Sequence, residues 1–322
     1  MQIFDAEATR AALPFGALID ALRRLFATGC EVPPRHVHAV TDAAGAEAGT
    51  VLLMPAWTRG GLLGIKTVGI FPANATLGLP ALHSTYMLND ASTGVPLALI
   101  DGNEITSRRT AASSALAASY LAPAHANRLL VVGSGRVARL LPEAYAAVRP
   151  IEQVGVWSRR PEAARALAEV LRGEGFAATA VEDLAEAASA ADIVSCATLA
   201  TEPVVHGAWL RANSHLDLIG SFTPAMREAD DACFAGARIY VDTAEALTKS
   251  GDLLGPMTRG VFAAADVSAT LEQLCRGEWG GDQGAGLASR TVFKSVGTAL
   301  EDLAAAMLVV GLPARDCAKV EI

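Results

Sequence analysis

The sequence predicts an α/β protein in which a Rossmann-type, doubly wound parallel sheet is inserted into a second, α+β domain. Residues 129–132 are a short apolar run that breaks into a glycine-rich turn and a helix-like stretch. After that turn, short apolar segments alternate with helical patterns, as in a parallel sheet covered by helices. The earlier part of the chain instead shows successive strand-like segments. We therefore expect an inserted domain at 123–296 and a surrounding domain at 1–122 plus 297–322.

The composition is that of an ordinary folded protein. The chain has 322 residues, enough for two domains, and is 52% hydrophobic and 19% charged. Its net charge of −8, without a basic tract, argues against nucleic-acid and anionic-membrane binding. Five scattered cysteines without a C-x-x-C pattern predict neither disulfides nor a metal site. No secretion signal or membrane-length apolar stretch is visible, so we expect a cytoplasmic protein with small-molecule partners.

The first domain begins with a predicted helix and continues with strands. Apolar residues at helical spacing predict a helix over 14–28 that ends at Gly29. Short segments typical of an antiparallel or mixed sheet follow at 32–40, 50–57, 62–70, 82–89 and 96–101.

Thr106 is a candidate N-cap for a helix that runs to about Leu121. This start places Arg108 and Arg109 in the first turn, where cations oppose the helix dipole unless an anion binds beside them. The two arginines are therefore candidate anion ligands. The alternative is that both point into solvent.

The glycine turn has the G-x-G-x-x-A pattern of a dinucleotide-binding loop. Gly133 allows a tight turn off the strand, Gly135 lets backbone N–H groups approach a pyrophosphate, and Ala138 lets the helix pack closely on the sheet. The flanking strand and helix favour this interpretation over a chance glycine-rich turn. Pro142, however, falls inside the predicted helix, where it removes a hydrogen bond.

The end of the second strand of this domain indicates which cofactor is preferred. An acidic residue there would hold the ribose 2′-hydroxyl of NAD(H). The sequence has Ser158, Arg159 and Arg160 instead, which suit a 2′-phosphate. NADP(H) is therefore favoured and NAD(H) is possible; the alternative is that both arginines merely flank a solvent-facing turn.

The remaining elements continue the alternation. We predict strands near 153–158, 177–181, 192–197, 215–220 and 238–242, and helices at 161–172, 182–191 and 267–277. A loop with four glycines at 280–286 precedes a long apolar helix at 296–310, which we expect to pack back on the first domain.

Lys66 and Arg35 are the other candidate cations of the first domain. Residues on the same strand face as Lys66 are apolar or glycine, so its ammonium needs a bound carboxylate or an internal Asp or Glu. The alternative is a lysine that reaches out to an exposed edge. Arg35 has the planar fork that suits a carboxylate. His36 and His38 alternate on one face, but no third metal ligand follows at usable spacing.

Together these segments resemble the ornithine cyclodeaminase/mu-crystallin family. The motifs stand in the family's order along nearly the whole chain: PPR at 33–35, GIKTVGIFPAN at 64–74, TGVPLALIDG at 93–102, TSRRTAASSALAASYLA at 106–122, VVGSGRVA at 131–138, ATEPVV at 200–205, IGSFTPAMREAD at 219–230, VDTAEAL at 241–247 and VFKSVGTALEDLA at 292–304.

The resemblance implies a homodimer whose N-terminal domain forms the dimer interface and, with the returning C-terminal helix, binds the substrate. It implies that Arg35, Lys66 and Arg109 are the catalytic residues and hold the substrate carboxylate. The implied cofactor residues are, for the pyrophosphate, Gly133, Ser134, Gly135, Arg136 and Val137; for the adenosine ribose or its phosphate, Ser158 and Arg159; and near the nicotinamide, Thr198 and Val296.

One departure from the family pattern decides between activities. Members that cyclise ornithine carry a catalytic aspartate where Ser221 stands here, and serine does not titrate near neutral pH. The resemblance therefore favours an NAD(P)H-dependent reductase that takes Δ1-pyrroline-2-carboxylate or Δ1-piperideine-2-carboxylate to proline or pipecolate. The expected burial of Lys66, independently of the resemblance, indicates that Lys66 could deliver or relay the proton to the imine nitrogen. The alternatives are an ornithine cyclodeaminase or alanine dehydrogenase-like enzyme, and a noncatalytic, NADP-binding, crystallin-like protein.

Overall fold

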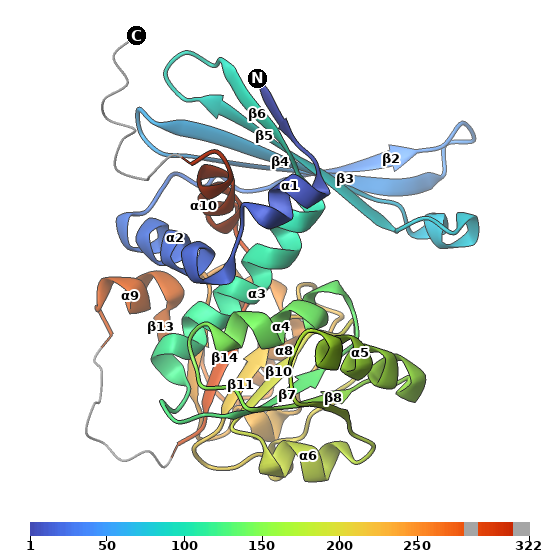
Figure 1. Ribbon diagram of the computed structural model, residues 1–322, viewed down its shortest axis with the longest axis vertical. Coiled ribbons are helices and arrows are strands. Elements are labelled where there is room, and N and C mark those ends of the chain that lie inside the picture. The colour runs from blue at the N-terminus through green and yellow to red at the C-terminus, as the bar shows by residue number, and fades with distance from the viewer. Residues whose placement is uncertain (280–288, 312–322) are drawn as a thin grey trace. The chain divides into compact units, whose positions relative to one another are not determined.

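The computed structural model describes residues 1–279 and 289–311, and these form two compact units (Figure 1). Unit 1 comprises residues 1–109 together with the described residues from Thr298 onward. Unit 2 comprises the described residues of Thr110–Gly297. The second unit is thus inserted into the first, and the predicted fold class is confirmed. The predicted glycine-rich loop at 280–286 lies outside the described residues.

Unit 1 is built on a six-stranded sheet with the order β1-β6-β5-β4-β3-β2. Strands β2 to β6 pair antiparallel in succession, and β1 joins β6 in parallel. Strand β1, which has only three residues, and the short helix α1 that follows it were not predicted from the sequence. The elements are β1 (Gln2–Phe4), α1 (Ala6–Ala11), β2 (His36–Thr41), β3 (Glu47–Trp57), β4 (Leu62–Ile70), the 3-10 helix η1 (Pro72–Leu77), β5 (Leu82–Asp90) and β6 (Pro96–Asp101).

Two helices supply the core of unit 1. Helix α2 (Phe15–Thr28) buries the apolar stripe that predicted it and ends at Gly29, whose φ is 76°. Helix α10 (Ala299–Val309) begins after its N-cap Thr298 and packs against α2, β3 and β4. Figure 1 shows both helices on the same side of the six-stranded sheet. Because α10 is buried almost all round, any charged side chain on it must find a partner inside the unit.

Helix α3 (Gly102–Leu121) starts one turn earlier than the sequence predicted. Asp101, not Thr106, serves the helix start, since its carboxylate accepts a hydrogen bond from the Glu104 N–H at 2.7 Å. The Thr106 hydroxyl donates back to the Gly102 carbonyl at 2.7 Å. Arg108 and Arg109 therefore lie in the second turn, away from the exposed amides of the helix N-terminus, and the anion argument built on that position was wrong.

Arg108 has a structural role within unit 1. Its Nε donates to the Leu13 carbonyl at 2.8 Å, and its guanidinium lies over the Phe15 ring at 4.3 Å. This geometry holds α3 against the start of α2. Arg109 faces a different set of residues, described below.

Unit 2 is an eight-stranded, fully parallel sheet with the order β13-β12-β14-β11-β10-β7-β8-β9. The chain runs outward from β7 to β9 on one side and then returns to β10 on the other side of β7. The pair β7 and β10 is therefore the topological switch point, where doubly wound sheets bind ligands at the carboxyl ends of their strands. The strands are β7 (Arg128–Val132), β8 (Gln153–Trp157), β9 (Ala178–Ala180), β10 (Ile193–Cys196), β11 (His215–Leu218), β12 (Arg238–Val241), β13 (Val267–Thr270) and β14 (Thr291–Lys294).

The helices of unit 2 mostly follow the predicted ranges, with one correction. Residues 267–270 form β13 rather than the start of a helix; Thr270 then caps α9, and Gly277 ends it. Pro142 lies buried inside α4. The elements are α4 (Arg136–Ala146), α5 (Pro161–Gly173), α6 (Leu184–Ala190), α7 (Ala246–Lys249), α8 (Gly251–Thr258), α9 (Leu271–Arg276), η2 (Gly207–Trp209), η3 (Asp231–Cys233) and η4 (Ala264–Asp266). None of the helices in the described ranges of the chain is long and apolar enough to cross a membrane.

Candidate active site

Lys66 is buried in unit 1 beside an acidic partner. It lies on β4, its side chain is only 2% exposed, and its Nζ is 2.6 Å from Oδ2 of Asp302 on α10. A second contact runs from Nζ to the Thr106 hydroxyl at 3.4 Å. The sequence predicts a bound or an internal carboxylate beside Lys66. Asp302 is the internal one.

Arg109 joins the same group from α3. Its Nε is 3.0 Å from Oδ1 of Asp302, and its Nη1 is 2.5 Å from Oε2 of Glu301. Asp302 therefore bridges Lys66 and Arg109 with its two oxygens. We call Lys66, Arg109, Glu301 and Asp302 the ion-pair cluster; all four are buried, and their formal charges sum to zero.

Burial and charge together set the protonation states in the ion-pair cluster. Burial lowers the pKa of Lys66 to about 8; the Asp302 carboxylate opposes this shift and the Arg109 guanidinium adds to it. Burial alone would raise the pKa of Asp302, but Lys66 and Arg109 together lower it below its usual value. Lys66 is thus mainly protonated at neutral pH, and it can release its proton at a pH only slightly above neutral.

The other predicted residues of unit 1 lie at the start of its edge strand. Arg35 directly precedes β2 and is half-buried; its predicted role at the substrate carboxylate stays a prediction. His36 and His38 are exposed on β2, with their ring centroids 6.3 Å apart. Within residues 1–279 and 289–311, no group of three acidic, His or Cys side chains could hold a metal ion.

In unit 2 the glycine loop runs from β7 into α4, as predicted. Gly133 has φ +129°, and a Cβ there would lie 2.5 Å from the Ala197 carbonyl oxygen, so only glycine fits. Gly135 is the N-cap of α4, and a Cβ there would meet no protein atom within 4 Å. Nothing in the described chain therefore demands glycine at 135. A ligand phosphate that approaches the backbone would demand it.

The remaining predicted adenosine and pyrophosphate residues surround this loop. Ser134 and Ser158 place their hydroxyl oxygens 3.1 Å apart, which joins the end of β7 to the end of β8. Arg136 and Arg159 are exposed at the starts of α4 and of the loop after β8. Val137 is half-buried in the first turn of α4. The edge of the sheet thus offers backbone amides, hydroxyls and cations, which suit a phosphorylated ligand.

Thr198 and Val296 follow β10 and β14, and buried carboxylates fix both positions. Glu228 accepts hydrogen bonds from the Thr198 N–H and hydroxyl at 2.7 and 2.8 Å, and from the Gly220 N–H at 2.6 Å. Asp242 accepts from the backbone N–H groups of Val296 and Gly297 at 2.7 and 2.6 Å. These two acidic residues hold the carboxyl-end loops of three strands in place.

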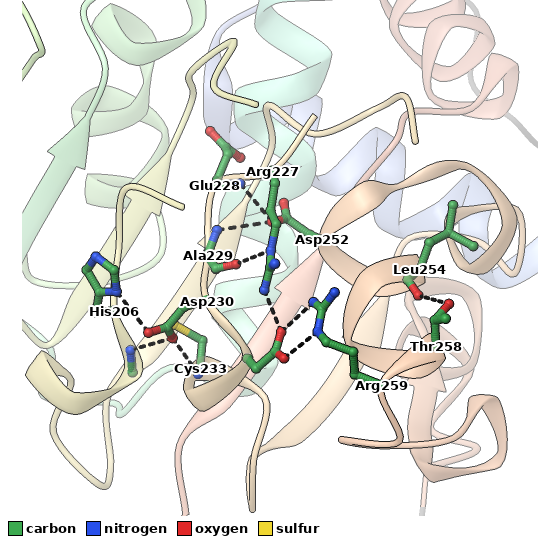
Figure 2. Close-up of polar contacts among 12 residues, drawn as sticks. His206, Arg227, Glu228, Ala229, Asp230, Cys233, Asp252, Leu254, Thr258 and Arg259 are labelled. Carbon is green, nitrogen blue, oxygen red and sulfur yellow. Dashed lines mark hydrogen bonds and ion pairs between the residues drawn. The ribbon is translucent and has the colours of Figure 1, made fainter. Parts of the chain in front are cut away.

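Two further buried charged residues, Asp252 and Lys294, lie close to Glu228. Asp252 accepts hydrogen bonds from the backbone N–H groups of Glu228 and Ala229, at 2.8 and 3.0 Å (Figure 2). Lys294 donates to the Leu218 carbonyl at 3.0 Å, and its Nζ is 3.6 Å from Asp252. Burial raises the pKa of Glu228 to about 7, while Lys294 opposes that shift.

Ser221 does not stand where a catalytic side chain could act. It is fully buried, its hydroxyl donates to the Met226 carbonyl at 2.6 Å, and its Oγ lies 2.9 Å from the Ser250 hydroxyl. The same oxygen accepts a hydrogen bond from the Asp252 N–H at 3.2 Å. That Ser221 stands at the place of the family's catalytic aspartate stays a prediction from the sequence; the structure adds that its hydroxyl is committed to the protein interior.

Two exposed side chains at this edge are apolar, and they were not predicted from the sequence. Phe222, next to Ser221, is 47% exposed, and Leu199, next to Thr198, is 78% exposed. They follow β11 and β10, two adjacent strands on the side of the switch point away from the adenosine residues. Their signal in the sequence was weak, since each is a lone apolar residue in a loop.

The comparison with known families decides what the chain is. A sequence model of the ornithine cyclodeaminase/mu-crystallin family matches residues 6–312. The protein belongs to the ornithine cyclodeaminase/mu-crystallin family. The resemblance inferred from the motifs is thereby confirmed.

Relatives within the family include enzymes with named activities. The chain is 42% identical over 261 residues to a Δ1-pyrroline-2-carboxylate reductase of Paracoccus denitrificans, covering 80% of this chain and 82% of the relative. Among solved structures, the Thermococcus litoralis Δ1-pyrroline-2-carboxylate reductase, in complex with NADH and L-proline, matches with a TM-score of 0.88 and 32% identity, over 96% of each chain. An archaeal alanine dehydrogenase dimer with bound NAD matches with a TM-score of 0.87 and 28% identity, over 96% of this chain and 94% of that chain.

Proposed function

We propose that this family member is an NAD(P)H-dependent reductase of cyclic imino acids. It takes Δ1-pyrroline-2-carboxylate, or the six-membered Δ1-piperideine-2-carboxylate, to proline or pipecolate. The observation that carries the proposal is Lys66, a buried lysine with a pKa of about 8 that Asp302 holds in place at 2.6 Å. The Paracoccus and Thermococcus reductases, similar over most of the chain, support the same substrate class.

The loop after β7 fits a nicotinamide dinucleotide. Gly133 is sterically required, and Gly135 leaves its backbone open at the start of α4. Gly133 to Val137 would hold the pyrophosphate, and Thr198 and Val296 would lie near the nicotinamide. When bound, the reduced cofactor supplies the hydride that reduces the carbon of the C=N bond.

The residues of unit 1 bind the substrate and supply the proton. Arg35 and Arg109 would hold the carboxylate of the imino acid, because a guanidinium forms paired hydrogen bonds with it. Lys66 would give a proton to the imine nitrogen, so that one hydride and one proton turn C=N into CH–NH. Asp302 fixes the Lys66 ammonium and keeps its pKa from falling further.

Ornithine cyclisation is not favoured, since neither Phe222 nor the enclosed Ser221 can exchange a proton near neutral pH.

NADP(H) is the cofactor that we propose, with NAD(H) as the alternative. Ser158 and Arg159 stand at the end of β8, where an NAD-specific site would carry an acidic residue. The Thermococcus reductase and the alanine dehydrogenase bind NADH and NAD, which makes NADH the necessary comparison in any assay.

We also propose a cytoplasmic homodimer that serves proline metabolism. The archaeal alanine dehydrogenase is a dimer, and unit 1 presents the exposed edge strand β2. The mass of this protein in solution, measured by light scattering, tests the dimer directly.

The activity is tested by following the loss of NADPH absorbance with Δ1-pyrroline-2-carboxylate, and then with NADH. Saturable oxidation supports the proposal; ammonia released from ornithine, with no reduction of the imine, would replace it with cyclodeaminase activity. In the Lys66→Met variant, turnover should be abolished while the fluorescence change on NADPH binding remains. Lys249→Met, at the i,i+4 pair with Glu245 on the surface of unit 2, is the matched control and should stay active.

A further inference from the structure

Tyr86 is a buried side chain that the mechanism above does not use. It lies on β5, directly opposite Lys66 in the antiparallel pair with β4, and is 1% exposed. Within the described residues, its hydroxyl has no hydrogen-bond partner. Buried hydroxyl groups in native proteins are nearly always paired, so this one requires an explanation.

The position of the hydroxyl places it on the face of the sheet that carries Lys66. A Cβ built at Gly64 would lie 1.8 Å from the Tyr86 hydroxyl oxygen, so the phenol fills the space above Gly64. Gly64 and Lys66 are two residues apart on β4 and share one face. The unpaired hydroxyl therefore lies on the same buried face of the sheet as Lys66 of the ion-pair cluster.

The chemistry of the phenol limits what it can bind. Burial, with a further contribution from the Asp302 carboxylate, raises the pKa of Tyr86 well above its usual value. The hydroxyl therefore keeps its proton at any pH at which the protein works, and is available as a donor. Tyr145 in unit 2 shows the usual solution for such a group, since its hydroxyl donates to the buried Asp217 at 2.8 Å.

The geometry points to the carboxylate of the imino acid substrate as the acceptor for the Tyr86 hydroxyl, an inference that rests on the proposed function. In the ion-pair cluster the charges of Lys66 and Arg109 are already offset by Asp302 and Glu301. A neutral donor on the same face adds binding capacity for an anion without adding another buried charge. The substrate nitrogen, once protonated, is itself a donor, so the carboxylate is the group that can accept.

The test compares Tyr86→Phe with the wild-type protein on two imines. Δ1-Pyrroline-2-carboxylate carries the carboxylate, and Δ1-pyrroline is the same ring without it. For the carboxylated imine, we expect kcat/KM to fall roughly 10- to 100-fold, the range for one hydrogen bond to a charged group. For Δ1-pyrroline we expect no change, because the acceptor is missing. The substitution removes one atom and no existing hydrogen bond, so the variant should fold.

Tyr145→Phe is the control, because it removes a phenol hydroxyl that already has a partner inside unit 2. It should lose stability without discriminating between the two imines. Equal kcat/KM for Tyr86→Phe and wild type on both imines would overturn the inference, and so would an equal loss on both. A wild-type protein that reduces neither imine would instead refute the proposed function, and the inference would fall with it.

Discussion

Asp302 is the residue on which the ion-pair cluster depends, and Asp302→Asn tests it with little change in shape. The substitution removes the negative charge that faces both Lys66, at 2.6 Å, and Arg109, at 3.0 Å. Breaking a buried ion pair from one side costs about 3–5 kcal/mol, because the remaining charge loses its compensation without regaining water. For a chain of 322 residues, that loss should lower the melting temperature by roughly 4–7 °C.

The same variant should move the pH dependence of activity. Lys66 has a pKa of about 8, so a rate that needs its proton is constant below that pH and falls above it. Asp302 raises this pKa, and its neutralisation should therefore shift the falling limb to lower pH. Thermal melts by circular dichroism, together with kcat/KM from pH 6 to 10, measure both effects.

Asp20→Asn is the matched control, because Asp20 pairs with Arg23 on the exposed surface of α2. It should change the free energy of unfolding by less than about 1 kcal/mol and leave the pH profile as it is. If Asp302→Asn has the melting temperature of the wild type, and its kcat/KM falls at the same pH, then the ion-pair cluster neither stabilises unit 1 nor sets the pKa of Lys66.

Three further outcomes are expected. Gly133→Ala should weaken NADPH binding and destabilise unit 2, because φ is +129° and the new Cβ would lie 2.5 Å from the Ala197 carbonyl oxygen. Gly173→Ala is the control and should do neither, because the space around Gly173 is open. Fluorescence titration gives the affinity for NADPH, and melting curves give the stability. Arg159→Ala should raise KM for NADPH and leave KM for NADH unchanged in the absorbance assay described above. Equal KM changes for the two cofactors would contradict the 2′-phosphate assignment. Burial, with a further contribution from Arg149, lowers the pKa of His215 to about 3. The stability that its neutral form contributes is therefore complete above pH 6.5 and is lost as the pH falls, by about 2 kcal/mol at pH 5. Urea unfolding at pH 7.5 and pH 5 should show that the free energy of unfolding falls less over this interval for His215→Gln than for the wild type.

Local patterns predicted the elements of the fold where the turn residues are unambiguous. Strands β4 and β6 begin and end at the predicted residues, since glycines or a proline bound each of them. Helix α3 was misplaced because Thr106 has the side chain of an N-cap, and only the structure shows that its hydroxyl turns back to Gly102. Strand β13 was missed because four residues before the capping box of α9 carry too little pattern of their own.

The site could be predicted in part, and the reason lies in sequence separation. Lys66 and the glycine loop were identifiable, because their own neighbours show that a charge is buried or a backbone exposed. The acidic partners were not, since Glu228 binds Thr198 from 30 residues away and Asp302 binds Arg109 from 193 residues away. That the Ser221 side chain is enclosed while that of Phe222 is exposed could not be predicted either, because which of two adjacent loop residues faces inward depends on partners such as Ser250.

The placement of Glu301 and Asp302 on α10 has a consequence for synthesis on the ribosome. A nascent chain first makes Lys66 and Arg109, then the whole of unit 2, and only afterwards the helix that carries their counter-ions. Until α10 emerges, folding of unit 1 would enclose two uncompensated cations, which is strongly unfavourable. The nucleotide-binding unit can therefore mature first, and chains that stop before α10 would expose a sheet without its covering helix to proteases and chaperones.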